Sequence, residues 1–79
     1  MTTLETTRST LEYYKKLYLT HIERLQELGS KLSREKDMVQ LSRISNQIDR
    51  IVCELEATQA RIFAYTETIL LLKWEVEHE

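Results

Sequence analysis

A seven-residue repeat of apolar side chains runs through almost the whole second half of the chain. One position of the repeat holds only aliphatic residues, and the companion position is apolar or aromatic except at Thr58. The first position comprises Leu41, Ile48, Leu55, Ile62, Ile69 and Val76, and the second comprises Ile44, Ile51, Thr58, Tyr65 and Leu72. Residues at this spacing share one face of an α-helix, and a sustained heptad is typical of a helix that packs lengthwise against another. The repeat therefore predicts one long amphipathic helix.

A similar repeat, with two polar members, runs through the first part of the chain. It comprises Leu4, Leu11, Tyr18, Leu25 and Leu32 at one position, and Thr7, Tyr14, His21 and Leu28 at the other. Thr2 and Glu5 have the spacing of a capping box, which predicts the start of this helix. Asp37, with Gln40 three residues later, is typical of the cap of a second helix.

The chain contains one glycine and no proline, so it offers few positions for a turn. Gly29 follows Leu28 directly, at a place where the end of a helix favours glycine. The predicted elements of one domain over residues 1–79 are a helix over 3–28, a connection over 29–36 and a helix over 37–77. Leu32 still fits the first repeat, so a first helix that is one turn longer is the alternative.

The expected fold is all-α, an antiparallel helical hairpin with a coiled-coil-like seam. Folding about the predicted connection brings together residues whose numbers add up to about 65 or 66. The predicted pairs are Leu25 with Leu41, His21 with Ile44, Tyr18 with Ile48, Tyr14 with Ile51, Leu11 with Leu55 and Thr7 with Thr58. This register places the two threonines of the seam opposite each other.

In this register the second helix continues for about 15 residues, or roughly 20 Å, beyond the start of the first. That overhang is the most apolar part of the chain, and Phe63, Leu70 and Trp74 lie in it away from the heptad positions. A helix that is apolar on more than one side requires burial on more than one side. We therefore expect a different protein, or a second copy that forms a homodimer, to cover it. The predicted partner-binding residues are Ile62, Phe63, Tyr65, Ile69, Leu70 and Trp74.

The charge and the arrangement of polar residues argue against several other functions. Eleven basic and thirteen acidic residues are spread along the chain without a basic patch, which disfavours nucleic-acid binding. The longest apolar run, residues 69–72, is too short to cross a membrane, and no signal peptide is evident at the start. Cys53 is the only cysteine, and together with His21 and His78 it has no metal-ligand spacing. We expect no enzyme activity, cofactor, metal or membrane insertion, and a cytoplasmic location.

The chain resembles the small co-chaperones of type III secretion needle subunits. The likeness is in the helix, turn and longer helix, and locally in the opening Met1-Thr2-Thr3-Leu4, in Gly29-Ser30-Lys31-Leu32 and in Arg61-Ile62-Phe63-Ala64-Tyr65. The resemblance implies a non-enzymatic protein that binds and stabilises a helical-repeat (TPR-like) chaperone in the bacterial cytoplasm. Through that chaperone it would help to keep a needle subunit soluble and monomeric until export.

A second resemblance gives an alternative function. Ser45 and Asp49, within Ser45-Asn46-Gln47-Ile48-Asp49, are similar to the Ser-x-x-x-Asp motif of short aspartyl-phosphate phosphatases, which are also helical hairpins. This resemblance implies that Asp49 acts on the acyl phosphate of a response regulator. Gln47 departs from the acidic residue usual at its position, and the family lacks the apolar end of this chain. A dimeric coiled-coil regulator or adaptor is the other alternative.

Overall fold

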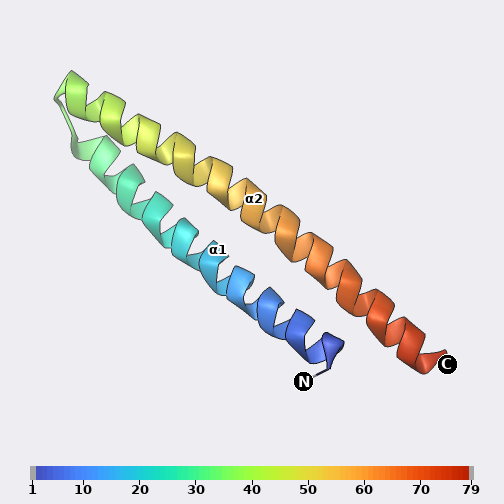
Figure 1. Cartoon of the computed structure of the whole chain (residues 1–79). Helices are drawn as coiled ribbons and strands as arrows, with labels where there is room; N and C mark the ends of the chain where they lie inside the picture. The colour runs from blue at the N-terminus through green and yellow to red at the C-terminus, as the bar shows by residue number, and fades with distance from the viewer. Residues whose placement is uncertain (1, 79) are drawn as a thin grey trace.

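The computed structural model describes residues 2–78 and consists of two antiparallel helices, α1 (Thr3–Arg34) and α2 (Met38–Glu77). Figure 1 shows the helices side by side along a narrow rod, which measures 63 × 16 × 15 Å. The expected all-α hairpin is confirmed. Met1 and Glu79, which belong to the predicted domain, lie outside the described residues.

Both predicted helix starts are confirmed by their caps. The backbone N–H of Glu5 donates to Thr2 Oγ1 at 3.2 Å, and the backbone N–H of Thr2 donates to the Glu5 carboxylate at 3.4 Å. At the start of α2 the Asp37 side chain accepts a hydrogen bond from the N–H of Val39 at 3.4 Å. Each bond satisfies an N–H group that the first turn of a helix leaves without a backbone partner.

The predicted connection over residues 29–36 is wrong, because α1 continues through Gly29 to Arg34. Gly29 does not have the positive φ of a helix-ending glycine. The connection is instead residues 35–37, and the Glu35 carboxylate accepts from the N–H groups of Lys36 and Asp37, both at 3.1 Å. A glycine inside a helix costs about 1 kcal/mol relative to alanine, whereas burial of one leucine contributes about 1.5–3 kcal/mol. The stabilisation from burying Leu28 and partly burying Leu32, on either side of Gly29, is thus larger than the cost of placing a glycine in the helix.

The two heptad stripes form the interface between the helices. Every predicted seam residue of α1, and every one of α2 as far as Leu72, is buried or half-buried, and only Val76 is exposed. Leu28 is fully buried. The pattern of apolar residues therefore identified the correct face of each helix.

The predicted register between the helices is wrong. Arg61 Nη1 donates to Tyr14 Oη at 3.0 Å, and His21 Nδ1 lies 3.8 Å from a carboxylate oxygen of Glu54. The residue numbers of each pair add up to 75, rather than the predicted 65 or 66. Relative to the predicted register, α2 is therefore displaced along α1 by about ten residues, or roughly 15 Å. The displacement follows from the longer α1, which moves the turn toward the C-terminus. As a result Thr58 shares a surface groove with Leu17 and does not face Thr7.

Thr7 and Thr58 are both buried, and each satisfies its hydroxyl group within its own helix. Thr7 Oγ1 donates to the carbonyl of Thr3 at 2.7 Å, and Thr58 Oγ1 donates to the carbonyl of Glu54 at 2.8 Å. Bonds of this kind leave no polar atom that requires a partner across the seam. The two threonines can therefore occupy separate places in the interface.

The register also removes most of the predicted overhang. Ile69 is only 8% exposed, and Tyr65 and Leu72 are half-buried against α1. With paired numbers near 75, Leu4 at the start of α1 lies level with Leu71. Only the last turn or so of α2, from Lys73 onward, extends past α1.

Candidate partner-binding surface

The end of α2 carries most of the exposed apolar surface on the described part of the chain. Nine large hydrophobic residues are exposed between residues 2 and 78, and five of them fall between Phe63 and Val76. These five, which we call the exposed apolar cluster, are Phe63, Leu70, Leu71, Trp74 and Val76, with 57–67% of each residue exposed. Four of them, Phe63, Leu70, Leu71 and Trp74, lie off the seam, whereas Val76 continues it past the end of α1. Exposed apolar surface gathered in one part of a protein is typical of sites that bind another protein.

The structure divides the predicted partner-binding residues into two groups. Ile69 is buried and Ile62 and Tyr65 are half-buried on the seam with α1, so these three residues do not belong to the exposed surface of this hairpin. Phe63, Leu70 and Trp74 are exposed. Their spacing of seven and then four residues places them along one side of α2, away from the seam.

Glu67 lies within the exposed apolar cluster, one helical turn from both Phe63 and Leu70. Glu67, Leu70 and Leu71 line a shallow hollow of about 300 Å³ on the surface of α2. A partner that covers this hollow has to supply a hydrogen-bond donor or a positive charge to Glu67, because an unpaired buried carboxylate is costly.

Trp74 is held in place by His78, the last described residue. The two rings are stacked with centroids 4.2 Å apart and planes inclined by 16°. The backbone N–H of His78 also donates to the Trp74 carbonyl at 3.0 Å, and His78 Nδ1 lies 2.8 Å from the same oxygen. The two contacts with the carbonyl hold His78 in place, and its stacked ring restricts the indole, which reduces the conformational entropy that binding would remove.

A group of aromatic rings joins the two helices near the exposed apolar cluster. Tyr14 stacks on Tyr65, with centroids 5.6 Å apart, and Tyr13 meets Tyr14 edge-on at 5.2 Å. Arg61 donates to Tyr14 Oη and also lies over the Tyr14 ring, 5.3 Å from its centroid. The Tyr14 and Arg61 groups are therefore engaged with each other, which indicates a structural role for this group of side chains.

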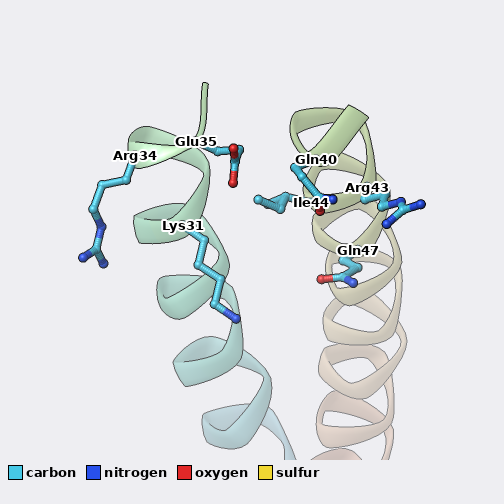
Figure 2. Close-up of a pocket in the computed structure, with 7 residues that line it drawn as sticks. All are labelled: Lys31, Arg34, Glu35, Gln40, Arg43, Ile44 and Gln47. Atoms are coloured by element: carbon cyan, nitrogen blue, oxygen red, sulfur yellow. The ribbon is translucent and has the colours of Figure 1, made fainter. Parts of the chain in front are cut away.

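A wide hollow lies at the turn end of the hairpin. It has a volume of about 490 Å³ and is lined by Lys31, Arg34, Glu35, Gln40, Arg43, Ile44 and Gln47. Figure 2 shows Arg34 and Arg43 pointing away from each other on opposite sides of the hollow, while Glu35 points between the helices. The cations do not converge on one point, as a phosphate or carboxylate site requires.

The residues considered for chemistry do not gather into one site. Ser45 and Asp49 are exposed on α2, and Cys53 is a free, exposed thiol. Among residues 2–78 no three His, Cys, Asp or Glu side chains lie close enough to hold a metal ion. Neither described helix combines the length and the apolar character needed to cross a membrane.

Comparisons of the chain with protein-family models, with curated proteins and with solved structures found no match. A partner-binding surface on α2 is inferred from the exposed apolar side chains of the hairpin itself.

Leu71 and Val76 belong to the exposed apolar cluster but were not among the predicted residues. Leu71 could have been recognised from the sequence, because it follows Ala57 and Ala64 at a spacing of seven residues and so lies on the same side of the helix. That series is hard to recognise by composition, since its early members are alanines. Val76 was assigned to the seam by its heptad position, and it is exposed because α1 does not reach so far.

Proposed function

We propose that this protein is a non-enzymatic co-chaperone that binds a helical-repeat (TPR-like) chaperone through the outer side of α2. In this proposal the pair keeps a needle subunit of a type III secretion system soluble and monomeric in the bacterial cytoplasm. The observation that carries the proposal is the exposed apolar cluster on a helix whose other side is already occupied by α1.

The cluster has the form expected of a helix that docks in a groove. Anchors at Phe63, Leu70 and Trp74 recur on one side of the helix, as in helix-in-groove recognition. Full burial of one large apolar side chain contributes roughly 1.5–3 kcal/mol, so exposure of five leaves a considerable driving force for association.

The hairpin supports this role by keeping α2 helical before a partner arrives. An isolated helix is only marginally stable in water, and its ordering would oppose binding. The α1–α2 seam provides that order through the buried leucines and isoleucines on the side of α2 facing α1. A rod only 15–16 Å thick has little core, so a partner that binds the folded state would also add stability.

The test uses tagged protein, expressed in its native host, and two variants of the exposed apolar cluster, Phe63→Ala and Trp74→Ala. Each truncation should cost about 1–4 kcal/mol of association, because aromatic anchors tend to dominate interfaces. We expect a helical-repeat chaperone and a needle subunit to co-purify with the unaltered protein and to be lost with each variant. Leu19→Ala is the matched control, because it removes an exposed leucine from α1.

Circular dichroism should show the same helix content in all variants, since none of these side chains lies on the seam. Recovery of a response regulator in place of the chaperone would favour the phosphatase alternative. Undiminished co-purification of the chaperone with both cluster variants would place its binding site elsewhere on the hairpin.

A further inference from the structure

A groove with basic walls follows the space between the helices near the turn. The hollow at the turn end and a second hollow of about 230 Å³ share Gln47 as a lining residue, so they adjoin along one side of the hairpin. The second hollow is lined by Arg24, Leu28, Gln47, Arg50 and Ile51. Figure 2 shows Lys31 and Gln47 on the two sides of the gap at the turn end. We call the two hollows together the basic groove.

The cations of the basic groove lie at two levels along the hairpin. Lys31 and Arg43 line the hollow at the turn end. Arg24 and Arg50 line the second hollow. On each helix the two cations are seven residues apart, which is about 10 Å along the axis. Each level therefore has one exposed cation on either helix.

Most of this positive charge has no counter-charge within residues 2–78. Arg24 donates to a glutamate of its own helix at 3.1 Å, whereas Lys31, Arg43 and Arg50 form no salt bridge with the described residues. The one carboxylate that lines the groove, that of Glu35, already accepts two backbone N–H groups. Cations that flank one groove repel each other, and a carboxylate placed between them removes that repulsion.

The positive charge is confined to the turn end of the molecule. Residues 24–50 contain six basic and four acidic residues, whereas the rest of the chain contains five basic and nine acidic ones. The basic residues are separated in the sequence, and they come together because the hairpin doubles back on itself. A local positive field on a chain of net charge −2 directs a negatively charged partner segment to this groove.

We propose that the basic groove binds an extended acidic segment of a partner protein. Arginine clusters recognise acidic motifs, and a guanidinium can hold a carboxylate through two hydrogen bonds. Carboxylates three residues apart in an extended chain are separated by about 10 Å, which matches the spacing of the two cation levels. The cations do not need to converge on one point, because each level receives its own carboxylate.

The uncharged walls of the groove favour an extended segment over a helix. Gln40 and Gln47 line the groove with exposed amides, which can bond to the backbone groups that an extended chain leaves without partners. A helix satisfies those groups itself and instead needs an apolar floor. The floor offers little, because Leu28 is fully buried and Ile44 is only 9% exposed.

The same walls disfavour a nucleic acid. Sites for single strands combine cations with aromatic side chains on which the bases stack, and none of the described residues that line the groove is aromatic. The acidic remainder of the chain also repels a long phosphate backbone, whereas a short acidic segment stays within the groove.

The basic groove is separate from the exposed apolar cluster. Phe63, where that cluster begins, lies 13 positions after Arg50, which is roughly 20 Å along α2. The proposal does not depend on the co-chaperone function, because it concerns another surface. Variants of the groove should leave chaperone binding intact, and variants of the cluster should leave the acidic segment bound, so failure of one proposal is distinguishable from failure of the other.

The first experiment measures binding of a fluorescein-labelled oligo-glutamate of about ten residues to the full chain by fluorescence anisotropy, in about 0.1 M salt. Lys31→Glu and Arg43→Glu should each weaken the affinity at least about tenfold, since attraction is replaced by repulsion. Arg43→Lys should retain most of it. Arg8→Glu is the matched control, because it makes the same change of charge at an exposed position of α1 outside the groove, beyond the range of screening.

We expect the affinity of Arg8→Glu to stay within about twofold of that of the unaltered chain. Circular dichroism should show the same helix content in all variants, since each altered side chain is exposed. Equal weakening by the control, or no binding of the unaltered chain at millimolar peptide, would overturn the proposal.

The second experiment locates the bound peptide without any substitution. In an NMR titration of the unaltered chain with the same oligo-glutamate, the amide signals that shift should belong to residues 24–35 and 40–51, and those from Phe63 onward should not move. An oligo-thymidine of equal charge should compete at least about tenfold more weakly. Shifts centred outside the basic groove, or stronger binding of the oligo-thymidine, would show that the groove is not a site for an acidic protein segment.

Discussion

Tyr14 and Tyr65 stack across the hairpin with ring centroids 5.6 Å apart and planes inclined by 15°. Arg61, one turn before Tyr65, reinforces the contact by donating to Tyr14 Oη at 3.0 Å. Directional contacts of this kind select one register among several that would equally match leucine with isoleucine. The stack therefore fixes which turn of α1 lies against which turn of α2.

The Tyr14–Tyr65 contact can be tested by removing one ring. Tyr65→Ala should destabilise the hairpin by about 1–3 kcal/mol, since a half-buried aromatic ring and its stacking are both lost. Thermal unfolding followed by circular dichroism measures the change. Tyr13→Ala is the control, because Tyr13 is exposed and makes only an edge contact, so its loss should cost less than about 1 kcal/mol. Equal effects of the two variants would contradict the structural role of the stack.

Leu28 is the best-buried side chain of the hairpin, with no measurable exposure, and it lies beside Ile51 across the seam. Leu28→Ala should destabilise the protein by about 2–5 kcal/mol, through lost burial and the cavity that remains. Chemical denaturation gives the free energy of unfolding. Leu19→Ala removes the same atoms from an exposed position and should change it by no more than about 0.5 kcal/mol.

Substitution of Asp49 distinguishes the proposed binding function from the phosphatase alternative. It is exposed on α2, and no ion pair involving it is present among the described residues. Asp49→Ala should therefore leave both stability and chaperone binding nearly unchanged if the protein is a co-chaperone. The assay incubates the purified protein with a phosphorylated response regulator. Dephosphorylation that disappears in the Asp49→Ala variant would show the alternative to be correct.

The sequence alone determined which residues face the other helix, because burial follows the heptad spacing directly. It could not determine the register. A seam with an apolar residue every three or four positions again matches apolar with apolar after a displacement of about ten residues. The contacts that distinguish the registers, Tyr14 with Arg61 and His21 with Glu54, involve residues beside the seam as well as on it.

The candidate surface was only partly predictable, because the sequence did not determine the register between the helices. Phe63, Leu70 and Trp74 could be recognised, because they lie off the seam whatever the register. Ile69 could not be assigned correctly, since its exposure depends on how far α1 extends along α2. That extent depended in turn on whether Gly29 ends the first helix.

Gly29 gives a direct test of the position of the turn. It lies inside α1 without a positive φ, and a Cβ atom placed on it would meet nothing within 4 Å. Gly29→Ala should therefore stabilise the hairpin by about 0.5–1 kcal/mol, because alanine loses less backbone entropy in a helix than glycine does. A glycine that ended the helix in the left-handed conformation would give the opposite sign, since alanine is strained there. Chemical denaturation of Gly29→Ala, with Ser30→Ala as a neighbouring exposed control, distinguishes the two cases. A loss of stability confined to Gly29→Ala would return the turn to residues 29–36 and shorten α1.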